Sequence, residues 1–184
     1  NFALSCQFAL ADKEMFINNP SPFIAGGDRF LLAVLNSKVA DYCIRSLGVR
    51  RNGGYFENKP MFVENLPIPQ LDNAVRRPFE TLANYVLVLT INNQKLQSTY
   101  FEQLIDGLVY ELYFPDEIKA SGKELLPHLG ELTPLTDDQT VEEKLAGIQH
   151  QFDRLYDPRH PVRNHLETLD SVEVVRTIRE ALNK

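Results

Sequence analysis

The feature of this sequence that most constrains its fold is a periodic set of apolar residues near the middle of the chain. The spacing is i, i+3, i+4, i+7, i+8 and i+11, and the residues are Phe101, Leu104, Ile105, Leu108, Val109 and Leu112. It places them on one face of an α-helix that ends before Pro115. Because another element must cover such a face, we expect one core that includes a helix over residues 79–91. The hydrophobic content of 43% suffices for that core and excludes a disordered chain.

Two further helices are expected before this one. The first covers residues 29–47, where Asp28 is a suitable N-cap and Gly48 a suitable left-handed C-cap. The second enters at 74–78 and continues through residue 98, because Pro78 is tolerated only near a helix start.

Two more helices are expected near the C-terminus. Thr140 and Glu143 have the spacing of a capping box, and the apolar residues of 141–155 alternate at four- and three-residue intervals like a coiled-coil seam. A last helix fits residues 171–182, with Asp170 and Glu173 again in capping-box relation.

The first part of the chain shows weaker, β-leaning patterns. Short apolar runs lie within residues 1–25 and 55–63, between prolines, glycines and asparagines. Pro67 and Pro69 keep the segment around residue 70 extended, which indicates a boundary there. We therefore expect an α+β fold, mainly α, in which a small β-containing recognition part (1–70) precedes an acidic helical bundle (71–184).

Charge is distributed unevenly between these two parts. The net charge is −6 overall, but residues 29–59 contain six Lys/Arg against only Asp41 and Glu57. The overall acidity argues against a nucleic-acid-binding surface that covers the whole protein, and a local basic stripe remains possible. A solvated, charged helix face explains the same counts equally well.

No segment has the pattern of a catalytic, metal or membrane-spanning site. Asn18–Phe23 resembles the Asn-Pro-Pro-Tyr loop of amino-methyltransferases only faintly, since Ser21 separates its two prolines. His160 and His165 lack the spacing of zinc ligands, and paired carboxylates such as Glu142–Glu143 fit helix starts. With only two cysteines and no apolar run of about 18–20 residues, a cytoplasmic protein without a membrane span is expected.

The loop after the first helix has the residues of a nucleic-acid contact. Arginine matches the O6 and N7 atoms of guanine, asparagine can pair with adenine, and both also suit phosphates. The candidate DNA-binding residues are Arg45, Arg50, Arg51, Asn52, Tyr55 and Lys59. Alternatively, the glycines form a plain turn and the arginines are solvated or pair with Asp41 and Glu57.

Three segments together resemble a known family. FLLAVLNSKVADYCIRSLG (30–48), GGYFENKPMFVENLPIPQ (53–70) and QLIDGLVYELYF (103–114) are similar to the "LNSK… GGYF… LPIP… ID-x-LVYELY" pattern of the TaqI-like C-terminal specificity domain. Such domains belong to type IIG restriction-modification enzymes and related adenine-specific DNA methyltransferases. The resemblance covers roughly residues 23–118. Its matched residues look like framework and not base readers: Leu35, Asn36, Ser37, Lys38, Gly53, Gly54, Tyr55, Phe56, Leu66, Pro67, Ile68 and Pro69.

The resemblance implies a non-catalytic fragment that recognises double-stranded DNA. The chain begins with Asn1 inside an apolar pattern, so we expect it to be part of a longer bacterial or archaeal protein. An upstream methyltransferase domain of that polypeptide would use S-adenosylmethionine, and Mg²⁺ would be needed if a nuclease domain is present. This chain itself would hold no cofactor or metal. The alternative is a helical protein–protein docking or oligomerisation module, suggested by the seam at 141–155 and the acidic second half.

Overall fold

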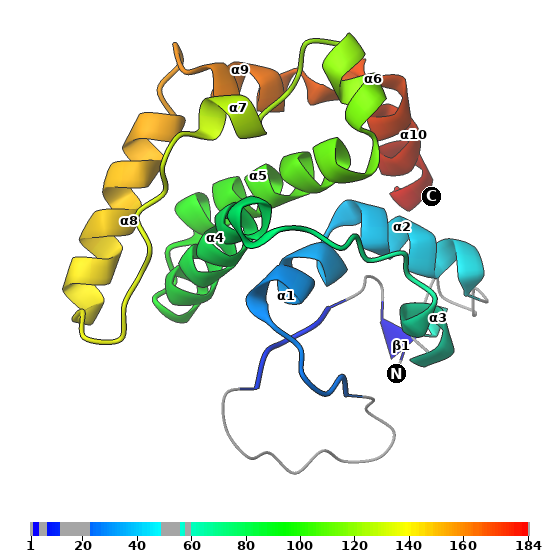
Figure 1. The fold of residues 1–184 in the computed structure, drawn as a ribbon, viewed down its shortest axis with the longest axis horizontal. Helices are drawn as coiled ribbons and strands as arrows, with labels where there is room; N and C mark the ends of the chain where they lie inside the picture. Colours follow the sequence, from blue (N-terminus) through cyan, green and yellow to red (C-terminus); the bar gives the residue numbers. More distant parts are fainter. Residues whose placement is uncertain (1, 4–6, 12–22, 49–55, 58–59, 184) are drawn as a thin grey trace.

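The computed structural model describes residues 2–3, 7–11, 23–48, 56–57 and 60–183, and these residues are predominantly helical. The helices of the first two thirds are α1 (Arg29–Leu35), α2 (Lys38–Leu47), α3 (Pro60–Glu64), α4 (Asn73–Ile91) and α5 (Lys95–Tyr113). The rest are α6 (Pro115–Ala120), α7 (Leu126–Leu129), α8 (Val141–Leu155), α9 (Pro161–Glu167), the short 3₁₀ helix η1 (Leu169–Ser171) and α10 (Glu173–Leu182). Figure 1 shows α4 and α5 in the centre, with α1–α3 on one side and α6–α10 as an arch on the other.

The predicted α+β class is wrong, because the described part of residues 1–70 forms no β-containing unit. Extended pairing there is limited to two residues on each side, Phe2–Ala3 (β1) with Phe56–Glu57 (β2), too short for a sheet layer. The apolar run 61–63, which looked like a strand, lies in α3. Pro60 begins this helix, where its fixed φ and missing N–H are tolerated.

The predicted helix over 29–47 is divided into α1 and α2. Asp28 caps α1 as expected, its carboxylate accepting from Leu31 N–H at 2.8 Å. Ser37 then has an extended backbone, and its hydroxyl accepts from Ala40 N–H at 3.3 Å to cap α2. Serine favours this local bond over the helix interior, so the chain can turn here without leaving amides unpaired. Gly48 ends α2 with φ −85°, so the predicted left-handed cap is wrong.

The predicted core between the α5 stripe and the helix over 79–91 is confirmed. Phe101, Leu104 and Leu108 of α5 are buried together with Phe79 and Leu82 of α4. The second predicted helix ends at Ile91 and not at residue 98, because a turn with Asn93 at φ 56° reverses the chain into α5. Asparagine tolerates this left-handed conformation better than most residues.

The same core extends across residue 70, where the sequence suggested a boundary. Phe30 of α1 packs edge-on against Phe79 of α4, with ring centroids 5.5 Å apart. The guanidinium of Arg76 lies 4.8 Å from the Phe30 ring centroid. The first helices and the central hairpin of α4 and α5 therefore share one hydrophobic core.

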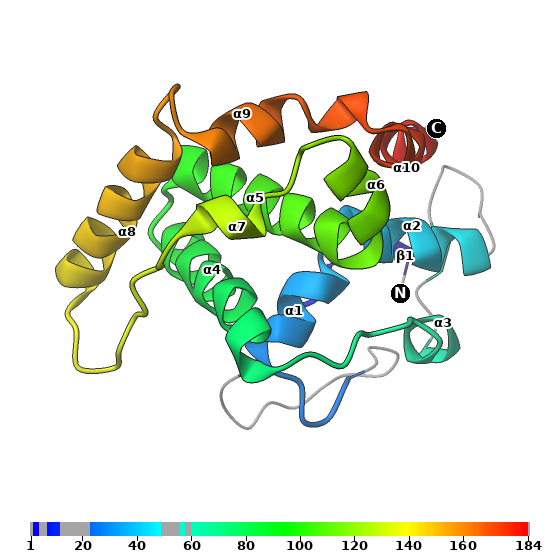
Figure 2. The ribbon, with the colours of Figure 1, turned by 45° about the horizontal axis from the view of Figure 1, so that its top comes forward.

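The C-terminal helices cover the other side of this hairpin (Figure 2). Thr140 and Glu143 form the predicted capping box at the start of α8. Phe152 of α8 packs against Tyr100 and Phe101 of α5, with ring centroids 5.4 and 6.3 Å apart. The second half of the apolar seam of α8, with Ile148, Phe152 and Leu155, is thus buried inside this chain.

One prediction for this side is wrong and one detail was not predicted. Asp170 and Glu173 do not form the predicted capping box, because Val172 occupies the N-cap position of α10 and Asp170 pairs with Arg179 at 2.6 Å. On α5, a Cβ added to Gly107 would lie 2.5 Å from Cδ1 of Leu125 and 3.0 Å from Cδ1 of Leu166. Glycine therefore permits the close approach of these segments to α5.

Candidate nucleic-acid interface

The candidate DNA-reading loop joins α2 to α3. Arg50, Arg51, Asn52, Tyr55 and Lys59 lie outside the described residues, so their assignment stays a prediction. Beside this loop, Leu47 at the end of α2 and Met61 in α3 are 50% and 56% exposed. The helices α1 and α2 and the segment after α3 hold a small separate core of Leu35, Ala40, Ile44 and Leu66. The loop therefore starts and ends on packed elements.

Arg45 is the one candidate that the structure describes, and its guanidinium is engaged within the protein. It forms a salt bridge with Asp41, one turn earlier on α2, at 2.9 Å, and the Arg45 side chain is 17% exposed. It also donates to the backbone carbonyl of Leu182 at 3.1 Å. Arg45 therefore joins α2 to α10 in this structure, and its contact with DNA stays a prediction.

Three polar contacts hold the segments that resemble the specificity domain. The first joins Asn36 to Phe8, which lies outside these segments, and the other two join one such segment to another. Asn36 lies between α1 and α2. Its amide donates to the carbonyl of Phe8 at 3.0 Å and accepts from the Phe8 N–H at 2.9 Å. These two hydrogen bonds hold the segment around Phe8 on the junction between α1 and α2.

The second contact joins α2 to α5 through Asp106. The backbone N–H of Lys38 donates to Oδ1 of Asp106 at 2.8 Å. Burial raises the pKa of Asp106 to about 6, although the Lys38 N–H and the charges of Lys38 and Arg179 act in the opposite direction. Desolvation therefore outweighs the favourable contacts, and the ionised carboxylate is held at a cost in free energy.

A shallow cavity lies beside Asp106. Its volume is about 380 Å³, and it is lined by Lys38, Gln103, Asp106, Leu166, Glu167, Arg179, Leu182 and Asn183. One turn along α5, the Tyr110 hydroxyl is buried without a well-formed hydrogen bond in the described part of the chain. The Arg179 guanidinium lies 5.9 Å from the Tyr110 ring centroid. The cavity wall thus has both charge signs, which does not favour an anion over a cation.

Asp106 was missed as a site residue by the sequence reasoning. It lies within the quoted QLIDGLVYELYF segment, next to the apolar stripe of α5. The sequence did contain one signal for Asp106, namely a charged residue at the edge of an apolar helix face. A carboxylate in such a place needs polar partners, because its desolvation is costly.

The third contact joins α5 to the LPIP segment. The hydroxyl of Tyr113 donates to the carbonyl of Pro67 at 2.9 Å. Burial raises the pKa of Tyr113 to about 12, so the hydroxyl remains a donor at neutral pH. This bond holds the extended segment between α3 and α4 on the end of α5.

We expect Tyr113→Phe to lower the free energy of unfolding by about 1 kcal/mol, because it removes one neutral hydrogen bond and keeps the ring. Urea unfolding of both proteins gives the difference. Tyr156→Phe is the matched control, since no hydrogen bond of the Tyr156 hydroxyl is described. An equal change in the two variants would contradict the role assigned to the Tyr113 contact.

A metal site, a methyltransferase loop and a membrane-spanning helix each require particular residues or elements. Among the described residues, no group of three or more His, Cys, Asp or Glu side chains could hold a metal ion. The Asn18–Phe23 loop lies almost wholly outside those residues. Within the same ranges, no helix has both the length and the apolar character to cross a membrane.

In comparisons with known proteins, no family model, no curated protein and no solved structure matches this chain.

Proposed function

We propose that this chain is the target-recognition part of an adenine-specific DNA methyltransferase of the restriction-modification type, and that it binds double-stranded DNA sequence-specifically. The upstream domain of the same polypeptide would hold S-adenosylmethionine and carry out the methyl transfer. The observation that carries the proposal is the meeting of the resembling segments at Lys38–Asp106 and Tyr113–Pro67.

These contacts support a framework role for the matched residues. The Asn36 amide, the Lys38 N–H and the Pro67 carbonyl bind other parts of the protein. Reading of bases is then left to the chain between the matched residues, where Arg50 and Arg51 lie. Recognition residues are commonly found on loops that a rigid scaffold positions.

The alternative docking module has less support. It was suggested by the apolar seam of 141–155, but Ile148, Phe152 and Leu155 are buried in the core of this chain. Packing within the protein therefore explains the second half of the seam, whereas Val141 at its start is 49% exposed. We favour DNA recognition for this reason.

Two alanine variants of the full-length protein test the proposal. If Arg50 or Arg51 contacts a base edge, its replacement by alanine should weaken the free energy of DNA binding by about 1–3 kcal/mol. It should also relax discrimination between bases at one position of the recognised site. If the arginine contacts a phosphate, its replacement should weaken the binding of all DNA sequences alike. It should also lower the salt dependence of DNA binding by roughly one charge. The measurement is methylation of the recognised duplex and its single-base variants at two salt concentrations.

Arg176→Ala is the matched control for this experiment. Arg176 is exposed on α10, so the substitution removes the same charge from the acidic half of the chain. We expect it to leave site discrimination unchanged. If Arg50→Ala and Arg51→Ala both behave like Arg176→Ala, the loop is not part of the DNA interface.

A further inference from the structure

Three of the four histidines lie where α7 meets α9. His128 is in α7, His160 is the N-cap of α9, and His165 is within α9. The rings of His128 and His165 meet edge to face, with centroids 5.2 Å apart. Histidine is the side chain that ordinarily changes charge near pH 6 to 7.

His160 performs a function that only its unprotonated Nδ1 can perform. This atom accepts from the backbone N–H of Val162 at 3.2 Å and so caps the first turn of α9. Protonation of Nδ1 removes the acceptor. It also places a positive charge at the helix end where the backbone dipole is positive.

His165 connects α9 to the segment before α7. Its Nδ1 lies 2.7 Å from the carbonyl oxygen of Glu124, which makes this nitrogen an N–H donor. The second ring nitrogen then carries no hydrogen in the neutral ring. If His128 and His165 both become charged, two cations face each other at ring-contact distance.

Of the charged groups around His160, two oppose its protonation and one favours it. Burial lowers the pKa of His160, as do Arg154 of α8 and His128, while Asp157 raises it. Arg154 donates to the carbonyls of Leu129 and Glu131 at 3.0 and 3.3 Å, so its charge is fixed beside the α7–α8 segment. From α5, Glu111 is occupied by the N–H groups of Leu125 and Leu126, at 2.7 and 3.0 Å.

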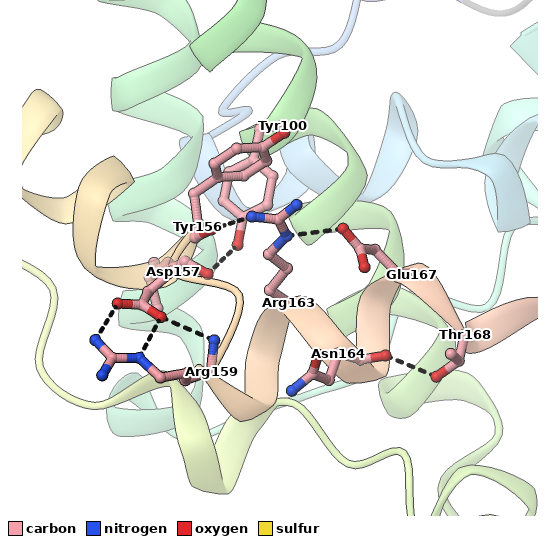
Figure 3. A network of polar contacts seen from close by, with 9 residues as sticks. Tyr100, Tyr156, Asp157, Arg159, Arg163, Asn164, Glu167 and Thr168 are labelled. Carbon is pink, nitrogen blue, oxygen red and sulfur yellow. Dashed lines mark hydrogen bonds and ion pairs between the residues drawn. The ribbon is translucent and has the colours of Figure 1, made fainter.

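Two carboxylates at this junction already pair with arginines (Figure 3). Asp157 binds Arg159 at 3.1 Å, and Glu167 binds Arg163 at 2.7 Å. Arg163 also donates to the carbonyl of Tyr156 at 2.6 Å. Protonated histidines here would add positive charge next to three arginines.

We infer that the contact between α7 and α9 is an acid-sensitive latch, closed while His128, His160 and His165 are neutral. When they take up protons, residues 124–131 and the first turn of α9 separate, while the core of α4 and α5 remains folded.

Native-state hydrogen exchange at about pH 7.5 and about pH 5.5, on either side of the histidine range, tests this inference. After correction for intrinsic exchange rates, the protection factor of the Val162 amide should be about fivefold lower in acid. This is the size expected for the loss of one N-cap hydrogen bond. Amides of residues 124–131 should lose protection in parallel. Amides of α4 and α5 should not change.

Three variants assign the effect. His160→Asn keeps an N-cap acceptor that does not titrate, so Val162 should stay protected in acid. His128→Gln removes one member of the ring pair, so residues 124–131 should stay protected. His150→Gln is the control, because His150 is exposed on α8, and it should keep the full acid response. Equal protection at both pH values in the wild type would overturn the inference. So would an unchanged acid response in His160→Asn, or opening of α4 and α5 together with the latch.

Discussion

Leu108→Ala is expected to lower the free energy of unfolding by about 2–5 kcal/mol, the range for removing a buried leucine side chain. Leu108 is 2% exposed on α5 and lies in the core shared by α4, α5 and the C-terminal helices. The truncation removes apolar contacts and leaves a cavity that the surrounding helices fill only partly. Urea unfolding at neutral pH measures the difference.

Leu96→Ala is the matched control on the same helix. Leu96 is 64% exposed, so its truncation should change the stability by less than about 0.5 kcal/mol, as for other surface substitutions. A loss at Leu108 as small as the loss at Leu96 would mean that α5 does not pack in this core.

Asp106→Asn is expected to raise stability above about pH 6, by at most about 3 kcal/mol. Burial raises the pKa of Asp106 from 3.8 to about 6, so the folded protein binds this proton more tightly than the unfolded chain. The stability contributed by the bound proton is present below about pH 4 and is lost as the pH rises through about 6. Asparagine retains an oxygen acceptor for the Lys38 N–H and carries no charge to desolvate.

The measurement is unfolding at a series of pH values between about 4 and 8, the range over which this carboxyl titrates. The wild type should lose stability between about pH 4 and 6 through this group, and Asp106→Asn should lack that component. Glu180→Gln is the control, because Glu180 is an exposed carboxylate on α10 and should leave the pH dependence unchanged. A wild-type pH profile in Asp106→Asn would show that the ionised carboxylate is well solvated or well paired.

Local patterns in the sequence were enough to predict several elements. The stripe from Phe101 to Leu112 defines α5, and the Thr140–Glu143 spacing defines the start of α8. In both cases the deciding interactions join residues three or four positions apart in the chain. The framework role of the three segments that resemble the specificity domain and the reading of DNA by Arg50 and Arg51 both stay predictions.

Long-range contacts decided the rest. The apolar run of residues 61–63 suits a strand or a short helix, and it is helical in the structure, where Phe62 and Val63 pack on the small core under α2. Ser37 could have stayed inside one helix, but a turn there lets α1 and α2 pack in different directions, with the Lys38 N–H on Asp106. Phe30 and Phe79 lie on either side of residue 70, where the sequence suggested a boundary, and they share one core.

Periodicity and capping by themselves therefore determined where the principal helices of this protein lie. The tertiary structure alone decided how they join and that the half-buried Asp106 carboxylate is desolvated between α2 and α5. The physical reason is that burial and charge desolvation depend on residues distant in sequence: 68 positions separate Lys38 from Asp106.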